Sequence, residues 1–481
     1  QPARTLDNLA PSSALATFQG TVDGQKIGHQ VASAGDVNGD GFDDLIFSQP
    51  GDAGGVASNW LIFGRASGWD QSVALDSLSG ADGVLISGSG TVVHTAGDVN
   101  SDSYADLIIS NPSASPDGMQ GAGESYLLFG HDGAWDETFD MSSLNGTNGA
   151  VLKGAAGDHS GQSVSNIGDV NGDTIDDLLV GAPNALPVGT AGDYHGQVYL
   201  VFGLDNTWNP SIDLSTLSGT SGLVIKGVNS NQLGSSVTNV GDINGDLIND
   251  LLISEAANVT TANGKAAANS YLIFGRDGGW SNGIDLNALS VNDGIKIVLP
   301  DNSTDITVNS AGDVNGDGRP DMIIGAPNAN NGEGQAFLIF GKRDGWDPTI
   351  YTSELNGTDG VIFQGAYKDG HSGQAIDGLG DVNKDGFDDF FIGHDTGGYL
   401  VYGRAQGWGA NYELYSYSTA DTHLLEVVDQ NSPSQLSVSN AGDINKDGYA
   451  DFLLGDQSAD GSSSTDIGNT YLVFGSDQLF F

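Results

Sequence analysis

A short acidic segment, GDVNGDGFDDLIF at residues 35–47, places oxygen-bearing side chains on alternate residues directly before an apolar run. Counted from Asp36, the loop has Asn38 at position 3, Asp40 at position 5 and Asp44 at position 9. Oxygen ligands at alternate residues of a tight loop suit a hard cation that takes roughly 6–8 oxygens, which is the preference of Ca²⁺. Phe42, at position 7, would supply only its backbone carbonyl.

The same loop recurs along the whole chain, in seven copies. Positions 1, 3, 5 and 9 are Asp, Asn, Asp and Asp in every copy, whereas position 7 varies, as expected of a residue that lends only a carbonyl. In loops 2 to 7 these five positions are Asp98, Asn100, Asp102, Tyr104 and Asp106; Asp169, Asn171, Asp173, Ile175 and Asp177; Asp242, Asn244, Asp246, Ile248 and Asp250; Asp313, Asn315, Asp317, Arg319 and Asp321; Asp381, Asn383, Asp385, Phe387 and Asp389; and Asp443, Asn445, Asp447, Tyr449 and Asp451. The sequence therefore predicts up to seven bound Ca²⁺ ions.

Other interpretations of the loop fit less well. An EF-hand needs a bidentate Glu at position 12 and flanking helices, but position 12 is apolar in all seven copies. Mg²⁺ demands a stricter octahedral geometry, and Zn²⁺ prefers His and Cys ligands. A plain turn rich in Asp and Asn stays an alternative for any single copy. It does not account for an Asp that opens an apolar strand seven times, where carboxylates would be desolvated and would repel one another.

We expect the seven sites to differ, because position 6 carries different residues. Glycine, which eases a sharp turn, stands there in four loops, as Gly41, Gly318, Gly386 and Gly448. Ser103, Thr174 and Leu247 replace it in loops 2, 3 and 4. If this position needs a positive φ, Leu247 is the least suitable of them. We therefore expect weaker or distorted binding in these three loops.

The elements that position the loops repeat with them, at a period of about 68 residues, which indicates a repeat architecture. Each repeat has a run such as YLVFG at 199–203, which is typical of a strand meeting a turn. Most also have a run such as GVLISG at 83–88. With the segments before and after the acidic loop, each repeat holds about four short strands. Four-stranded units repeated radially form a β-propeller, and seven lies within the usual number of blades.

We therefore predict an all-β fold, a single seven-bladed β-propeller of four-stranded antiparallel blades over residues 1–481. The segment ATFQG at 16–20 resembles VIFQG at 361–365, and the last repeat lacks such a strand. We expect residues 15–20 to complete the last blade and so close the ring. The expected blades are approximately 21–90, 91–155, 156–227, 228–300, 301–366, 367–432, and 433–481 together with 1–20.

Composition narrows the classes of partner. The chain has 62 acidic residues against 15 Lys and Arg, a formal charge of −47, which argues against nucleic acid and anionic membranes as partners. It has no cysteine, and no run of 18 apolar residues that would insert into a membrane. Extracellular calcium modules often bind only at about 10⁻⁴–10⁻³ M, so such loops favour a secreted or cell-surface location.

The chain also resembles a known family. The acidic loop, an apolar strand with GAP (LLVGAP at 178–183, IIGAP at 323–327) and the later FG are similar to the FG-GAP repeat, which builds the seven-bladed propeller of integrin α-subunits. The resemblance implies Ca²⁺ loops on one face, between the first two strands of a blade, and partner binding on the opposite face. Acidic loops in all seven repeats and the absence of cysteine depart from animal integrins, so we expect a bacterial relative.

We expect no enzyme, because the eight His residues form no metal-ligand spacing and neither a phosphate-binding loop nor a nucleophile elbow is present. The predicted function is a calcium-binding extracellular adhesion or ligand-binding module, with a protein or glycan ligand. A carbohydrate-binding module, or the non-catalytic part of a larger secreted enzyme, is the alternative. Six tryptophans follow the FG motif and are expected to anchor a turn in each blade: Trp69, Trp135, Trp208, Trp280, Trp346 and Trp408.

Overall fold

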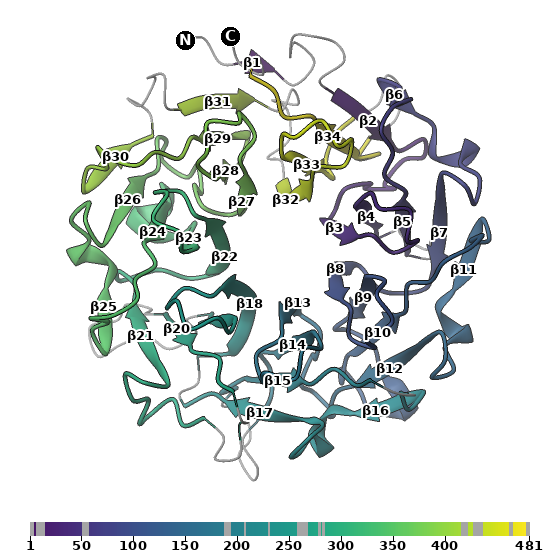
Figure 1. Ribbon diagram of the computed structural model, residues 1–481, viewed down its shortest axis with the longest axis horizontal. Helices are drawn as coiled ribbons and strands as arrows, with labels where there is room; N and C mark the ends of the chain where they lie inside the picture. The colour runs from purple at the N-terminus through teal and green to yellow at the C-terminus, as the bar shows by residue number, and fades with distance from the viewer. Residues whose placement is uncertain are drawn as a thin grey trace.

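The computed structural model is a ring of seven small β-sheets around a central axis, and the chain passes round the ring in sequence order (Figure 1). It describes residues 4–5, 15–50, 57–186, 194–205, 208–228, 231–256, 268–277, 280, 284–414, 422–426, 436–460 and 465–477. The predicted all-β, seven-bladed propeller is confirmed.

Every blade contains four antiparallel strands, which run in order from the central axis to the rim. They are β3 (Val31–Gly35), β4 (Asp44–Gln49), β5 (Ser58–Ile62) and β7 (Gly83–Ser87) in blade 1; β8 (Val92–Gly97), β9 (Asp106–Asn111), β10 (Glu124–Leu128) and β12 (Gly149–Lys153) in blade 2; β13 (Ser163–Gly168), β14 (Asp177–Ala182), β15 (Gln197–Val201) and β17 (Gly222–Lys226) in blade 3; β18 (Leu233–Gly241), β19 (Asp250–Glu255), β20 (Asn269–Ile273) and β21 (Gly294–Val298) in blade 4; β22 (Thr307–Gly312), β23 (Asp321–Ala326), β24 (Gln335–Ile339) and β26 (Gly360–Gln364) in blade 5; β27 (Ile376–Gly380), β28 (Asp389–His394), β29 (Gly397–Val401) and β31 (Thr422–Glu426) in blade 6; and β32 (Leu436–Gly442), β33 (Asp451–Asp456), β34 (Asn469–Val473) and β2 (Leu15–Gln19) in blade 7.

The two ends of the chain meet in the ring. The N-terminal strand β2 pairs antiparallel with β34, with Leu15 opposite Val473 and Gln19 opposite Asn469. An even earlier strand, β1 (Arg4–Thr5), pairs parallel with β31 of blade 6. Segments from the first 19 residues therefore lie in two different blades, each beside strands from the end of the chain (Figure 1).

Six of the seven sheets have a fifth, parallel strand at the outer edge in the described part of the chain, which the four-strand prediction missed. Five of these strands come from the connection between the third and fourth strands of the following repeat. They are β6 (Ser72–Val73), β11 (Thr138–Asp140), β16 (Ser211–Asp213), β25 (Thr349–Tyr351) and β30 (Asn411–Glu413). These five repeats therefore extend across the edge of the blade before them, and β1 takes this place on blade 6.

Helical structure is confined to single turns in the described residues. Four 3₁₀ turns follow outer-edge strands: η2 (Leu75–Ser77), η4 (Met141–Ser143), η5 (Leu214–Thr216) and η6 (Thr352–Glu354). Two more turns, η3 (Pro116–Gly118) and α1 (Ala329–Gly332), lie in connections between second and third strands.

The core lies between the blades. In β4, Leu45 and Phe47 pack in the cluster shared with blade 7, whereas Ile46 packs in the cluster shared with blade 2. All three are fully buried. The second strand of a blade is covered on both faces, so its sequence is apolar without alternation.

The tryptophans join blades, in addition to the predicted turn contact, in which the indole N–H groups of Trp69 and Trp408 donate to the carbonyls of Arg65 and Arg404 at 2.9 Å. The ring of Trp135 packs against Phe63 of the FG motif in the preceding repeat, with 6.0 Å between ring centroids. Four further pairs repeat this contact, namely Trp69 with Phe474, Trp208 with Phe129, Trp346 with Phe274 and Trp408 with Phe340. The phenylalanine of each of these FG motifs therefore receives a tryptophan from the next repeat.

Candidate metal centres

All seven acidic loops lie between the first and second strands of their blades and within the described residues. Since the first strands line the axis and each loop follows the end of its first strand, the loops gather on one face of the ring. Position 1 directly follows the first strand, and position 9 is the first residue of the second strand.

Each loop is held in shape by its own carboxylates. In loop 1, the carboxylate of Asp36 accepts hydrogen bonds from the backbone N–H groups at positions 4, 5 and 6, at 2.7 to 3.1 Å. The bonds from positions 5 and 6 recur in all seven loops. The Asp at position 5 accepts from the N–H at position 7, which is 2.9 Å away in loop 1. The side chains at positions 1 and 5 are therefore turned toward the loop backbone.

The aspartate at position 9 is fully buried in every loop. In loop 1, Asp44 accepts hydrogen bonds from the N–H of Val37 at 2.9 Å and from the N–H of Gly64 at 2.8 Å. The same two bonds form in the other six blades. Gly64 closes the FG motif, so the acidic loop and the third strand meet at this carboxylate.

Burial raises the pKa of all seven position-9 carboxyls to about 8, and the carboxylates at positions 5 and 1 of the same loop raise it as well. The backbone hydrogen bonds act in the opposite direction and are outweighed. No ion pair among the described residues involves position 9. A buried, ionised carboxylate would need a cation to offset its desolvation.

The Asn at position 3 brings the remaining side chains together. Its amide nitrogen donates to the Asp at position 5 in loops 1, 2 and 6, at 2.9 to 3.2 Å. In loops 3, 4 and 5 it donates to the Asp at position 9, at 3.2 to 3.3 Å. The Asn side chain thus contacts position 5 in three loops and position 9 in three others.

The groups at positions 1, 3, 5, 7 and 9 are of the type that Ca²⁺ prefers, because they offer only carboxylate, amide and carbonyl oxygens. Across the described residues, however, no three His, Asp or Glu side chains lie close enough together to hold a metal ion in their present positions. The carboxylates at positions 1 and 5 accept hydrogen bonds from N–H groups of the loop, and each keeps further lone pairs that could ligate a cation. Metal ligation at the 35 predicted positions stays a prediction.

The backbone at position 6 has the predicted positive φ in loops 2, 3 and 4, where Ser103, Thr174 and Leu247 have φ of 76°, 73° and 74°. Leu247 is 93% exposed, so no packing contact offsets this strained conformation. The backbone at position 4 is also left-handed, as in Lys384 and Lys446, which the residue pattern did not predict.

Neighbouring loops also touch, which the sequence did not indicate. The Nζ of Lys446 at position 4 of loop 7 lies 4.2 Å from the ring centroid of Phe42 at position 7 of loop 1. The Nζ of Lys384 in loop 6 lies 4.9 Å from the ring centroid of Tyr449 in loop 7. Residues at position 4 thus pack on position 7 of the following loop.

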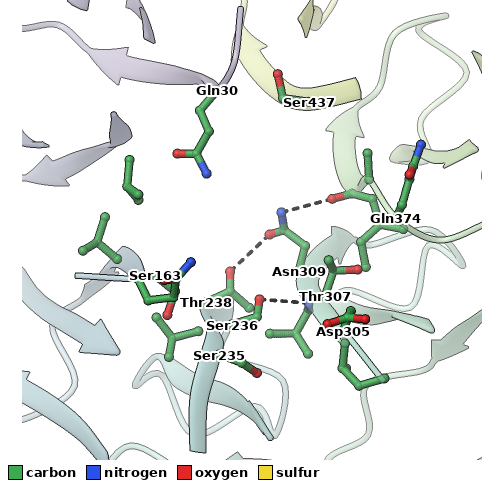
Figure 2. Close-up of a pocket in the computed structure, with 18 of the residues that line it drawn as sticks. Gln30, Ser163, Ser235, Ser236, Thr238, Asp305, Thr307, Asn309, Gln374 and Ser437 are labelled. Atoms are coloured by element: carbon green, nitrogen blue, oxygen red, sulfur yellow. Dashed lines mark hydrogen bonds between the residues drawn. The ribbon is translucent and has the colours of Figure 1, made fainter. Parts of the chain in front are cut away.

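At the other end of the first strands, a cavity of about 630 Å³ opens on the axis. It is lined by all seven blades, at residues that begin or precede the first strands, such as Gln30, Ser163 and Gln374 (Figure 2). Thr238 Oγ1 donates to Asn309 Oδ1 at 3.1 Å, and Asn309 Nδ2 donates to the carbonyl of Ile376 at 3.4 Å. Neutral amides and hydroxyls dominate its polar lining. The cavity lies away from the acidic loops.

Comparison with known proteins identifies the repeat. Residues 89–128, 160–201 and 307–339 match the FG-GAP repeat, in blades 2, 3 and 5. None of the helices in the described part of the chain is long and apolar enough to cross a membrane.

Two kinds of relative match part of the chain. The chain is 30% identical over 206 residues (37% of its length) to phosphatidylinositol-glycan-specific phospholipase D of Dictyostelium discoideum, of which 20% is covered. It is 29% identical over 153 residues (30% of its length) to integrin alpha-4 of Xenopus laevis, and 29% identical over 151 residues (30% of its length) to integrin alpha-6 of Homo sapiens, covering 14% and 12% of those proteins. The matched region thus spans a fifth or less of these relatives.

A solved structure of the Dos1 propeller aligns over 97% of both chains, with a TM-score of 0.42 and 10% identity. The chain carries FG-GAP repeats and forms a seven-bladed β-propeller that resembles the propeller of integrin α-subunits.

Proposed function

We propose that this propeller is a Ca²⁺-stabilised ligand-binding or adhesion module that works outside the cell. One observation carries the calcium part, namely the seven buried position-9 carboxylates, which no Lys or Arg of the described residues pairs with. Positions 1, 3, 5 and 9 and the carbonyl at position 7 would hold the cation, which would offset most of the negative charge of the loop and join the first strand to the second.

The ligand-binding part rests on the likeness to integrin α-subunits and on the geometry of the ring. With the loops on one face, the opposite face carries the axial cavity and the connections between second and third strands. Loops on a rigid scaffold often carry binding, and a neutral polar cavity suits an uncharged polar group of a protein or glycan. We infer that the ligand binds there.

A second function is favoured by the phospholipase D relative. The matched region covers only 20% of that protein, so the propeller would be a non-catalytic part of a larger secreted enzyme. The calcium loops would have the same stabilising role in either case, and the chain itself would perform no reaction.

Calorimetric titration with CaCl₂ tests the calcium part. We expect heat of binding with a stoichiometry of up to seven ions, and a melting temperature that rises with Ca²⁺ and falls with EDTA, because a ligand that binds only the folded state stabilises it. MgCl₂ at the same concentration should raise the melting temperature less. No binding heat and an unchanged melting temperature in millimolar Ca²⁺ would rule the proposal out.

A glycan array and a panel of extracellular matrix proteins, each probed with and without EDTA, test the ligand part. Gln30→Ala/Gln374→Ala alters the rim of the cavity, and Asp76→Ala, in the exposed η2 turn, is the control. We expect the rim variant to bind less and the control to bind as the wild type does. Equal binding by all three proteins would place the ligand elsewhere.

A further inference from the structure

Residues at position 8 connect adjacent loops. Asp176 stands at position 8 of loop 3, and its carboxylate Oδ2 accepts a hydrogen bond from the N–H of Asp98 at 2.9 Å. In return, the N–H of Asp176 donates to the carbonyl oxygen of Asp98 at 3.3 Å. Asp98 is position 1 of loop 2, so two hydrogen bonds in opposite directions join the first ligand residue of one loop to the next loop. We call this reciprocal pair of bonds a clamp.

A second clamp joins loops 5 and 6. The Oδ2 of Asp388 accepts from the N–H of Asp313 at 2.7 Å, and the N–H of Asp388 donates to the carbonyl of Asp313 at 3.2 Å. Each clamp residue directly precedes a position-9 aspartate, Asp177 in loop 3 and Asp389 in loop 6. Each clamp thus holds the backbone beside a predicted ligand in two loops: at position 1 of one loop, and next to position 9 of the following loop.

Three of the other five interfaces provide internal comparisons. Ala105 and Ala450 stand at position 8 of loops 2 and 7, and each makes only the backbone bond, to the carbonyls of Asp36 and Asp381 at 3.0 and 3.1 Å. Pro320, at position 8 of loop 5, has no N–H to donate. Among the described residues the clamp is confined to the interfaces between loops 2 and 3 and between loops 5 and 6.

We propose that Asp176 and Asp388 are positioning residues that make loops 2 and 3, and loops 5 and 6, bind Ca²⁺ as coupled pairs, while loop 4 binds independently of loop 5. The inference rests on the proposed calcium binding. A cation that orders one loop also fixes the clamp, so the partner loop has less conformational freedom left to lose when it binds. The coupling is reciprocal, as thermodynamic linkage requires.

Equilibrium dialysis of the full chain against graded free Ca²⁺, with bound metal counted per chain, tests the proposal. The loop 3 variant Asp169→Ala/Asp173→Ala removes the ligands at positions 1 and 5, and Asp242→Ala/Asp246→Ala does the same in loop 4. At the Ca²⁺ concentration that half-saturates the wild type, the loop 3 variant should lose more bound Ca²⁺ than the average occupancy of its own loop at that concentration, because the affinity of loop 2 falls at least ~5-fold. The loop 4 variant should lose no more than its own.

The double-mutant cycle isolates the clamp. In an Asp176→Ala background, the same loop 3 substitutions should remove only their own ion. The chain already has alanine at this position in two loops, so the substitution is tolerated elsewhere in the ring. Should this variant fail to fold, Asp388→Ala with the loop 6 substitutions Asp381→Ala/Asp385→Ala repeats the cycle at the second clamp. Asp76→Ala controls for the loss of one negative charge.

Equal losses by the loop 3 and loop 4 variants, or an excess loss that persists in the Asp176→Ala background, would overturn the coupling and leave calcium binding intact. A wild-type chain that binds no Ca²⁺ at millimolar concentration would instead refute the proposed function. The two failures are therefore distinguishable in a single data set.

Discussion

The backbone N–H of Gly64 donates a hydrogen bond to Oδ1 of Asp44 over 2.8 Å, and this bond links the two most regular motifs of the repeat. Asp44 opens the second strand and Gly64 follows the third. A Cβ built on Gly64 would lie 2.1 Å from the carbonyl oxygen of Asp43. Glycine is required here because the third strand must end against the backbone of the acidic loop. This contact explains why every repeat that has the acidic loop also has the FG motif.

Gly64→Ala should therefore destabilise the protein by about 3 kcal/mol or more, because the clashing Cβ pushes the backbone away and so breaks the hydrogen bond from its N–H to a buried carboxylate. Gly68→Ala is the control, because its Cβ would meet no atom within 4 Å. Only its positive φ of 89° opposes the substitution, at about 1–2 kcal/mol. Urea unfolding of both variants measures the difference, and equal losses would contradict the role of Gly64.

Leu247→Gly should strengthen loop 4. The leucine is 93% exposed and its backbone has a φ of 74°, so glycine removes strain of about 1–2 kcal/mol without removing a packing contact. We expect a higher melting temperature and tighter Ca²⁺ binding. In the reverse change in loop 5, Gly318→Leu, the added Cβ meets no atom within 4 Å, and the positive φ should lower both quantities. Unchanged values in this matched pair would show that the backbone at position 6 does not limit the loop.

Trp208→Ala should destabilise the ring at the interface between blades 2 and 3. Trp208 is 2% exposed, and its ring centroid lies 5.9 Å from that of Phe129. Removing a buried tryptophan costs about 3–5 kcal/mol. The same change at the less buried Trp69 should cost less, and thermal unfolding of the two variants provides the comparison. A larger loss at Trp69 would argue against burial between blades as the source of the stability.

The sequence was sufficient to predict the seven blades because the second and third strands of each blade are bounded by a chemical marker. The aspartate at position 9 begins the second strand, and the glycine of FG follows the third. The outer-edge strands have no such marker, since β6 is only two residues long and pairs with a different repeat. A pattern within one repeat contains no information about pairing with its neighbour.

The candidate site was predictable only to the level of residue types. The recurrence of Asp and Asn at fixed positions identified the loops, and the positive φ at Leu247 followed from the glycines at the same position in other loops. The clamp at Asp176 was not predictable, because position 8 holds alanine, asparagine or proline in four other loops, and the aspartate at position 8 of loop 1, Asp43, makes no such pair of bonds among the described residues. It depends on the spacing of adjacent blades, which only the folded ring defines.

Asp377 in β27 should make the stability of the calcium-saturated protein depend on pH. Desolvation raises the pKa of its carboxyl to about 8, outweighing hydrogen bonds from the N–H groups of Asn440 and Gly378. The folded state therefore binds more protons than the unfolded state between about pH 4 and 8, and stability falls as the pH rises through this window. Asp377→Asn removes this contribution, so its melting temperature should fall less than that of the wild type between pH 6 and 8. Measuring both in excess Ca²⁺ keeps the loop carboxylates ionised, and parallel profiles would show that Asp377 titrates normally.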